Sequence, residues 1–244
     1  MSNLSSQNRP TIQSKHPLLD VLCYNTDVIS YPTDMDKLKK EILIATENRG
    51  KAREIEVIFR DTDFVLRFLY EFKEAIGGLQ IVENAKDFEG NALIKAIIVG
   101  EKLGMLTLAD DSGLCVAALD GRPGVYSARY SAEKTDEANN RKVLAEMENV
   151  PEEKRDCFYN CTVAIYDPVT KFVETVSGQW HGRVAREPRG IKSFGYAPIF
   201  LLRESDYRKT NAEFEPSELI DMNHRGKAFR EAIEVLKGYA EKNQ

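Results

Sequence analysis

Apolar runs of strand length and stretches with helically spaced apolar residues follow one another from residue 41 to the C-terminus. The runs predict strands at residues 41–45, 79–82, 106–109, 114–119, 158–166 and 171–185. The helical spacing predicts helices over residues 64–76, 88–103 and 135–147, and two more that begin after Asn48 and Gly226. Asp167 and Pro168 separate the two long strands, which predicts a hairpin.

The first 40 residues are predicted to be an N-terminal extension, followed by one domain over residues 41–244. Residues 1–16 are rich in Ser, Asn and Gln, which predicts disorder. Residues 17–40 are compatible with a short helix of no assigned role. Arg9 and Lys15 faintly resemble a transit peptide, but an ordinary frayed terminus is the favoured interpretation.

The strand predicted at residues 106–109 ends abruptly in Asp110, Asp111, Ser112 and Gly113. Side chains alternate along an extended backbone, so the two carboxylates should face opposite ways. One is expected to face a cleft and the other to hold the loop by accepting hydrogen bonds from backbone amides. Acids at a strand end lie where open α/β sheets bind ligands, but a plain turn is the alternative that these residues alone favour.

Composition limits the classes of function. The chain has 244 residues, 42% hydrophobic and 30% charged, as in ordinary globular proteins. A net charge of -5 argues against nucleic-acid binding. No apolar run is long enough to cross a membrane and no signal peptide is visible, so no membrane partner is expected. Four cysteines without Cys-x-x-Cys spacing predict reduced, buried thiols in a cytoplasmic protein.

A polar loop from Thr46 to Lys51 joins a predicted strand to a predicted helix. Asn48 is a good N-cap, and free N–H groups at a helix start, with Lys51 in the first turn, favour an anion. The loop is not a Walker A motif, because Ala52 stands where that motif has Ser or Thr. A plain capped helix is an equally good interpretation.

Lys95 lies on the apolar stripe of the helix predicted over residues 88–103, three residues from Ala92 and four from Val99. A lysine on such a face is costly unless its ammonium group reaches water or an anion. Reaching water is the usual outcome, and a bound phosphate is the sharper hypothesis. Glu83 stands just past the strand predicted at residues 79–82.

Six blocks stand in order along the chain: Thr46-x-Asn48-x-x-Lys51-x-x-Glu54, Phe88 with Asn91-Ala92-Leu93-Ile94-Lys95-Ala96, Ala109-Asp110-Asp111-Ser112-Gly113-Leu114, Pro123-Gly124-Val125-Tyr126-Ser127-Ala128-Arg129-Tyr130, Phe194-Gly195-Tyr196 and His224-Arg225-Gly226. In this order and at this spacing they resemble the inosine triphosphate pyrophosphatase family, which hydrolyses non-standard purine nucleoside triphosphates. The resemblance covers about residues 41–238.

The resemblance implies an α/β fold with a long mixed β-sheet, flanking helices and two lobes around a nucleotide cleft, usually in a homodimer. It implies attack of water on the α-phosphate of a nucleoside triphosphate, giving monophosphate and pyrophosphate. Mg²⁺ is the implied cofactor, with Mn²⁺ as a possible substitute. Magnesium commonly uses one or two protein carboxylates plus phosphate oxygens. Glu83 and Asp111 can supply the carboxylates.

Matched block by block, the resemblance also implies roles for individual residues. Asp111 would act as catalytic base, and Glu83 and Asp111 would bind the metal. The implied substrate-binding residues are Thr46, Asn48, Lys51, Lys95 and Ser112 near the phosphates, and Phe194, Gly195, Tyr196, His224 and Arg225 near the base. The only histidines are His16, His181 and His224, so no Ser-His-Asp set competes and direct hydrolysis is expected.

The chain departs from the family pattern mainly where the base is held. Ala197 stands where the family has Asp, Leu219 where it has Lys, and Asn223 where it has Ser. Near the phosphate end, Ala85 and Gly90 differ from the usual Gly and Glu. Loss of groups that hydrogen-bond a substrate should change or relax the choice of base.

Three hypotheses follow. The first is a pyrophosphatase for inosine or xanthosine triphosphates, and the second is the same chemistry with altered base selectivity in a dedicated nucleotide pathway. The third is a non-catalytic nucleotide-binding protein of the same fold. Retention of Glu83, Lys95 and Asp111 argues against the third hypothesis.

Overall fold

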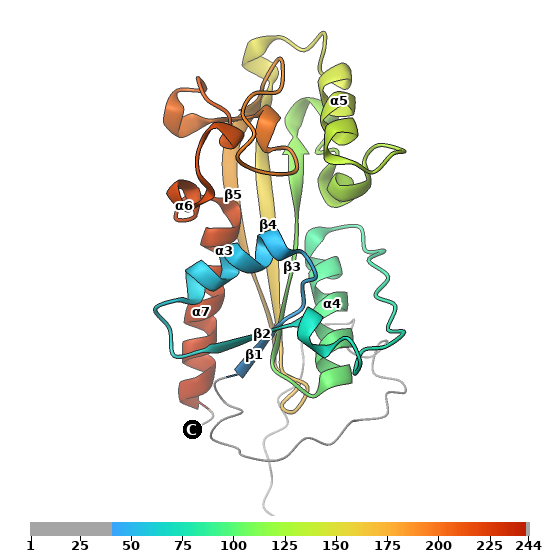
Figure 1. Cartoon of the computed structure of the whole chain (residues 1–244), viewed down its shortest axis with the longest axis vertical. Coiled ribbons are helices and arrows are strands. Elements are labelled where there is room, and N and C mark those ends of the chain that lie inside the picture. The colour runs from blue at the N-terminus through green and yellow to red at the C-terminus, as the bar shows by residue number, and fades with distance from the viewer. Residues whose placement is uncertain (1–40, 243–244) are drawn as a thin grey trace, which may run out of the picture.

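A six-stranded mixed sheet with three long central strands carries the fold (Figure 1). The computed structural model describes residues 41–242, so the predictions for residues 1–40 and Cys23 lie outside it. The strand order is β2-β1-β3-β4-β5-β6; β1 is parallel to β2 and β3, and the other pairs are antiparallel. The strands are β1 (Glu41–Ile44), β2 (Val65–Phe68), β3 (Thr107–Val116), β4 (Asp156–Tyr166), β5 (Val173–Val184) and β6 (Phe200–Leu202).

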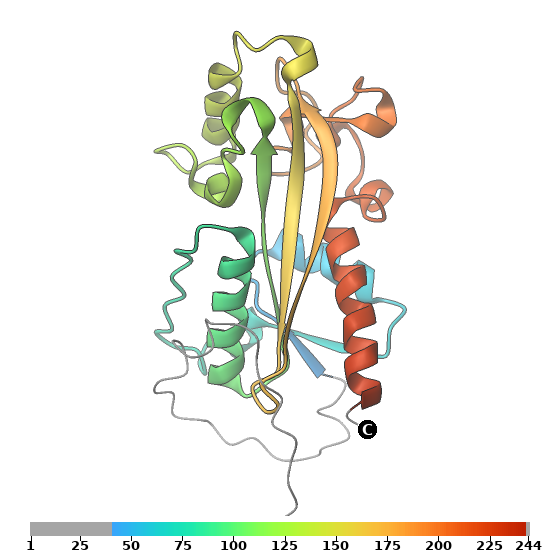
Figure 2. The ribbon, with the colours of Figure 1, turned by 180° about the vertical axis from the view of Figure 1, so that it is seen from behind.

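Helices cover both faces of the sheet (Figures 1 and 2). They are α3 (Arg49–Phe59), α4 (Phe88–Leu103), α5 (Asp136–Glu146), α6 (Pro216–Leu219) and α7 (His224–Lys242). Short 3₁₀ helices are η1 (Leu69–Phe72), η2 (Ala117–Leu119), η3 (Gly124–Arg129), η4 (Glu152–Lys154), η5 (Ala197–Ile199), η6 (Arg203–Ser205) and η7 (Asn211–Glu213). Within residues 41–242, no helix combines the length and apolar character that a membrane span requires.

The core has three clusters of buried apolar side chains. Two clusters lie in one lobe and the third lies in the other, which agrees with the two lobes implied by the resemblance. In one lobe, α3 and α7 pack on one face of the sheet and α4 packs on the other. In the other lobe, the far ends of β3, β4 and β5 pack with α5, α6 and β6. The long strands therefore join the lobes and carry polar residues into the space between them.

Small residues allow two close contacts that shape this space. A Cβ atom on Gly178 would lie 2.3 Å from the His224 carbonyl oxygen, so the start of α7 rests directly on β5. A Cβ atom on Gly113 would lie 2.4 Å from Ser127 Oγ, so η3 packs directly on β3. Glycine at these positions brings His224 and Ser127 close to the sheet.

The prediction that a strand ends at Asp110 is wrong. β3 continues through the Asp-Asp-Ser-Gly segment and pairs with β4 in unbroken register, Asp110 opposite Val163 and Asp111 opposite Thr162. The two strands predicted at 106–109 and 114–119 are thus one strand, and η2 replaces its predicted end. The predicted opposite orientation of the two carboxylates is confirmed, since Asp110 contacts Lys51 of α3 and Asp111 contacts Asn91 of α4.

Two other predicted elements are also wrong. The helix predicted over residues 64–76 is strand β2 followed by η1, because this segment pairs in parallel with β1. The strand predicted at residues 79–82 has no regular structure. Its apolar side chains, Leu79 and Ile81, pack against the core beside α4 instead of joining the sheet.

The remaining predicted elements are confirmed. β1, the β4–β5 hairpin and α5 are present, and α3 begins after its predicted cap, Asn48. The C-terminal helix α7 is also present, but it begins at His224 and not after Gly226, so His224 and Arg225 lie in its first turn. α4 spans Phe88–Leu103 as expected and ends at Gly104 in the left-handed conformation, which glycine adopts without strain. Cys115, Cys157 and Cys161 are free and buried.

Candidate active site

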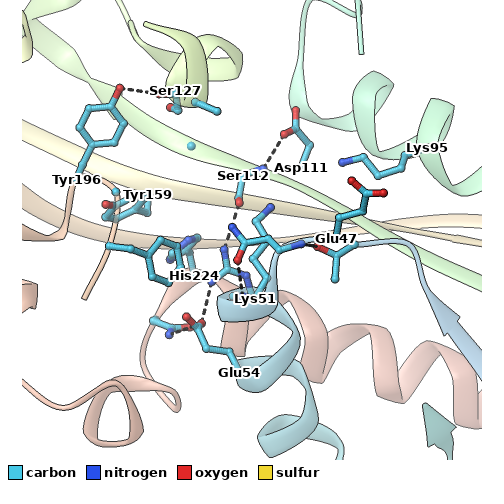
Figure 3. A pocket seen from close by; sticks show the side chains of 18 of the residues that line it. Glu47, Lys51, Glu54, Lys95, Asp111, Ser112, Ser127, Tyr159, Tyr196 and His224 are labelled. Atoms are coloured by element: carbon cyan, nitrogen blue, oxygen red, sulfur yellow. Dashed lines mark hydrogen bonds and ion pairs between the residues drawn. The ribbon is translucent and has the colours of Figure 1, made fainter. Parts of the chain in front are cut away.

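A cavity of about 570 Å³ lies between the two lobes. Its walls come from the β1–α3 loop, α4, β3, η3, the loop before η5, and the start of α7. All twelve residues proposed from the sequence line it: Thr46, Asn48, Lys51, Glu83, Lys95, Asp111, Ser112, Phe194, Gly195, Tyr196, His224 and Arg225. Figure 3 shows that Lys51, Lys95 and Asp111 lie on one side and Tyr159, Tyr196 and His224 on the other.

The start of α3 is capped by its own side chains. Asn48 Oδ1 accepts hydrogen bonds from the N–H groups of Gly50 at 2.8 Å and Lys51 at 3.1 Å. Thr46 Oγ1 accepts from the N–H of Asn48 at 3.3 Å. The expectation of free N–H groups at this helix start therefore needs correction, because the cap satisfies two of them. What remains for an anion is the positive end of the helix dipole and the Lys51 side chain.

Asp110 is the centre of a buried charge network. It is 2% exposed, and its Oδ2 lies 2.8 Å from Lys51 Nζ and 3.8 Å from Arg225 Nε. Burial opposes ionisation of Asp110, but Lys51 and Arg225 outweigh it and hold the pKa of this carboxyl well below its ordinary value. Asp110 therefore orients cationic side chains, which corrects the expectation that it bonds to backbone amides.

Arg225 extends this network from α7. Its Nη1 lies 2.8 Å from Glu54 Oε2, and its Nη2 donates to Ser112 Oγ at 3.3 Å. Asn223 Nδ2 donates to the same Glu54 oxygen at 3.4 Å. Glu54 of α3 thus fixes Asn223, just before α7, and Arg225 connects the start of α7 to β3.

Asp111 points to the other face of β3, where α4 holds it. Its Oδ2 accepts from Asn91 Nδ2 at 2.9 Å, and its Oδ1 accepts from the N–H of Ser112 at 2.9 Å. Burial raises the pKa of Asp111, despite the lowering effects of Asn91 and Lys95. A carboxylate with a raised pKa is a better proton acceptor, which suits a general base.

Asn91 also connects Asp111 to the segment that carries Glu83. It is fully buried in the first turn of α4, and its Oδ1 accepts from the N–H of Ala85 at 3.0 Å. The Asn91 side-chain nitrogen therefore holds Asp111, and its side-chain oxygen holds the segment that carries Glu83. Sequence reasoning placed Asn91 in a family block but gave it no role, because no local pattern indicates that this side chain contacts Asp111, 20 residues away.

The buried-looking Lys95 is satisfied by anionic partners of the protein itself. Its Nζ lies 2.9 Å from Glu83 Oε1 and donates to the Asp110 carbonyl oxygen at 3.0 Å. Burial lowers the pKa of Lys95, but the neighbouring carboxylates of Asp110 and Glu83 outweigh burial and leave this pKa raised, so the side chain is charged. Glu83 was expected just past a strand, but it lies in the irregular segment before α4.

The donor set fits a hard cation. Glu83 and Asp111 both line the cavity, and each contacts a residue of α4. In residues 41–242, no cluster of three or more His, Cys, Asp or Glu side chains is arranged to hold a metal. Magnesium commonly uses only one or two protein carboxylates and takes its other ligands from phosphate and water. Two carboxylates beside two lysines match that type of site.

The opposite wall is aromatic. His224 stacks on Tyr159 with ring centroids 4.7 Å apart and ring planes at 12°. Burial, with the nearby cations Arg225 and Lys51, lowers the pKa of His224 well below its ordinary value, so the ring is neutral. Tyr196 donates through its hydroxyl to the Ser127 carbonyl oxygen at 2.8 Å (Figure 3). Trp180, which sequence reasoning did not select, also lines this wall.

Ala197 and Leu219, where the chain departs from the family pattern, differ in their access to the cavity. Leu219 is 4% exposed and lines the cavity, whereas Ala197 is 1% exposed and is not among the described residues that line it. Sequence reasoning also missed Tyr159 and Asp136, because a strand residue and a helix-start residue carry no signal of a site. Only the folded chain brings them to the cavity.

Comparisons with known proteins identify the family of the chain. Residues 42–235 match the Ham1 family. A dITP/XTP pyrophosphatase of Geobacter sulfurreducens is 44% identical over 189 residues, 77% of this chain and 92% of that protein. The dITP/XTP pyrophosphatase of Bacillus subtilis is 39% identical over 202 residues, 82% of this chain and 98% of that protein.

Solved structures show the same fold. A HAM1 protein from Coxiella burnetii superposes with a TM-score of 0.72 at 35% identity, covering 81% of this chain and 98% of that one. The Ham1 protein of Staphylococcus aureus superposes with a TM-score of 0.70 at 33% identity, covering 84% of this chain and all of that one. The chain therefore belongs to the Ham1 family.

Proposed function

We propose that this protein is a nucleoside triphosphate pyrophosphatase that releases pyrophosphate and a nucleoside monophosphate. The observation that carries the proposal is the position of Asp111, a nearly buried carboxylate with a raised pKa, in a cavity with two lysines on one side and aromatic rings on the other. The relatives named dITP/XTP pyrophosphatase support the same activity.

The triphosphate would lie on the charged side of the cavity. Lys51 and Lys95 would bind its oxygens, with Thr46, Asn48 and Ser112 beside them. Both lysines already contact carboxylates, so phosphate oxygens would replace one set of anions with another and leave the lysines charged. Asp111 would take a proton from the water that attacks the α-phosphate, and the cations would stabilise the charge that develops.

Glu83 and Asp111 would hold Mg²⁺, with Mn²⁺ as a substitute. When bound, the cation neutralises phosphate charge and helps to orient the triphosphate. Asn91 would keep both carboxylates in place, since it contacts Asp111 directly and the Glu83 segment through Ala85.

The base would occupy the aromatic side, between Phe194, Gly195, Tyr196, His224 and Arg225. Inosine and xanthosine triphosphates are the proposed substrates, and the alternative is a changed base preference caused by Leu219 in the wall. We also propose, from the resemblance, a cytoplasmic homodimer that does not bind nucleic acid or membranes. A non-catalytic role would give no reason for holding Asp111, Glu83 and Lys95 in one cavity.

Pyrophosphate release from a panel of ribo- and deoxyribonucleoside triphosphates tests the proposal. Inosine, xanthosine, adenosine, guanosine and pyrimidine triphosphates should be compared with MgCl₂ and with excess chelator. We expect metal-dependent release of pyrophosphate, not of single phosphates. Nucleotide binding without any release would instead support the non-catalytic alternative.

A further inference from the structure

The loop that carries Phe194 is held at Gly195 by two residues of α5. The N–H of Gly195 donates to Asp136 Oδ2 at 2.7 Å, and the carbonyl oxygen of Gly195 accepts from Asn140 Nδ2 at 3.0 Å. Asp136 and Asn140 are four residues apart and therefore lie on one face of α5. Both hydrogen-bonding groups that border Gly195 are thus fixed by a helix that is 55 or more residues away in the sequence.

Gly195 is a position where such fixing matters. Its φ is +64°, in the left-handed region, and a Cβ atom added there would meet no neighbour within 4 Å. Glycine populates positive and negative φ about equally, so packing alone does not hold this backbone in one conformation. The hydrogen bonds from α5 supply the restraint that the missing side chain cannot give.

Phe194, the residue before Gly195, reaches the opposite lobe. Phe194 is 45% exposed, and its ring lies where a Cβ atom on Gly50 would approach Cε1 at 3.1 Å. Gly50 belongs to the first turn of α3, the phosphate side of the cavity. Phe194 therefore lies against the phosphate-side helix, while its backbone is attached to α5.

Other contacts of the loop do not replace this attachment. The N–H of Lys192 donates to the Ala212 carbonyl oxygen at 3.0 Å, and the Tyr196 hydroxyl donates to Ser127. These two contacts hold the ends of the loop. The N–H of Ala197 also donates to the Phe194 carbonyl oxygen at 3.3 Å, but this bond lies within the turn and does not attach it to another element. Removing the α5 contact should loosen the position of the ring and leave the loop attached.

We propose that Asp136 and Asn140 are positioning residues that set the place of Phe194 over the nucleotide. This inference rests on the proposed function. We call the two hydrogen bonds from Asp136 and Asn140 to Gly195 the clamp. Neither residue contacts Asp111, so the hydrolytic step should not depend on the clamp. Nucleotide affinity and base discrimination should depend on it. Asp136 is exposed, and its substitution should leave the fold intact.

The test compares the wild type with Asp136→Ala, Asp136→Asn and Glu137→Ala. Glu137 is also exposed and acidic in the first turn of α5, yet it makes no hydrogen bond within the described residues, so it controls for the helix dipole. Steady-state pyrophosphate release is measured with inosine triphosphate at saturating MgCl₂. Amide hydrogen exchange is measured on a peptide that covers residues 193–197.

For Asp136→Ala we expect KM to rise about tenfold, with kcat within about twofold, since a hydrogen bond to a charged group is lost. The peptide covering residues 193–197 should exchange faster. Asp136→Asn keeps an acceptor for Gly195 and should restore most of both values, and Glu137→Ala should match the wild type. Unchanged KM and exchange in Asp136→Ala, or equal effects in Glu137→Ala, would overturn the inference.

The two proposals fail in different ways. If the wild type released no pyrophosphate from any nucleotide, the proposed function would be wrong, but hydrogen exchange would still report the clamp. If the wild type were active and Asp136→Ala behaved like Glu137→Ala, the function would stand and the clamp would be wrong.

Discussion

The two sides of the cavity are built from different interactions. On the phosphate side, charged groups hold one another: Lys51 with Asp110, Arg225 with Glu54, and Lys95 with Glu83. On the base side, rings stack and hydrogen bonds end on backbone groups, such as Tyr196 on the Ser127 carbonyl. Under the proposed function, the first side would bind phosphate oxygens, which are common to all nucleotides. The second side would distinguish the shapes and edges of the bases, so we propose that it selects the substrate.

The most severe break of the phosphate side is Asp111→Asn. This change keeps the shape and one of the two hydrogen-bond acceptors but removes the charge that accepts a proton, so kcat should fall by about 10²–10⁴-fold. Pyrophosphate release and thermal unfolding of the same sample are the measurements. A folded variant with near-normal turnover would contradict the role assigned to Asp111.

The neighbouring carboxylate should respond in stability. Asp110→Asn leaves Lys51 and Arg225 facing each other without their shared anion, which should lower the free energy of unfolding by about 3–5 kcal/mol. Urea denaturation measures the loss, and Asp63→Asn is a control because Asp63 is exposed and has no ion pair within the described residues. Equal stability of the two variants would remove Asp110 from the centre of the network.

The contrast between these adjacent residues shows what could be predicted from sequence. Alternation along a strand placed the two carboxylates on opposite faces, and this holds. The same segment was expected to turn, because Asp, Ser and Gly are typical of turns. The strand continues because β4 satisfies its backbone and because Lys51, Arg225 and Asn91 satisfy its carboxylates. These partners lie 20 to 115 residues away along the chain, so no local pattern reveals them.

The base side was less predictable for the same reason. Phe194, Gly195, Tyr196 and His224 were identified through short blocks, but their surroundings were not. Tyr159 and Trp180 lie on strands that alternate like any others, and only the register of β4 and β5 places them side by side. The loss of an Asp at Ala197 looked like a change in the cavity wall, whereas this side chain is in the core.

The metal proposal sharpens the comparison on the phosphate side. Glu83→Gln removes one of two carboxylates, so the Mg²⁺ concentration for half-maximal activity should rise about tenfold. Binding of Mn²⁺, followed by electron paramagnetic resonance, reports the same change without turnover. Glu47→Gln is the matched control, because Glu47 lines the same cavity but has no proposed metal role. Full activity in excess chelator would contradict the proposal.

The base side is tested with Leu219→Lys, which restores the family's residue at the departed position that lines the cavity. The wild type should hydrolyse inosine triphosphate less well than its relatives do, because base edges facing Leu219 bury unpaired polar atoms. Leu219→Lys should shift kcat/KM toward inosine and xanthosine triphosphates by about tenfold relative to adenosine triphosphate. Leu219 is buried, so retained folding must be checked.

Leu79→Lys, which adds the same charge at another part of the cavity wall, should not change this ratio. If the wild type already prefers inosine triphosphate by several orders of magnitude, the two departures are neutral and base selectivity has not been altered.

The smallest expected effect separates the two sides by pH. His224 is neutral and buried, with a pKa well below that of an unfolded histidine, so the unfolded chain binds a proton first. Stability should therefore fall as pH drops below about 6.5, by at most about 1.4 kcal/mol per pH unit. Arg225, Lys51 and Lys227 help to lower the pKa of His224, and Asp110 acts against them.

Asp110 has the opposite type of shift, a lowered carboxyl pKa. Its contribution to stability is full above about pH 4 and is lost only at lower pH. Urea titrations of the wild type and His224→Gln between pH 5 and 7 should differ in slope, with the variant flatter. Identical slopes would show that the pKa of His224 is the same in the folded and unfolded protein, and would contradict a buried, neutral His224.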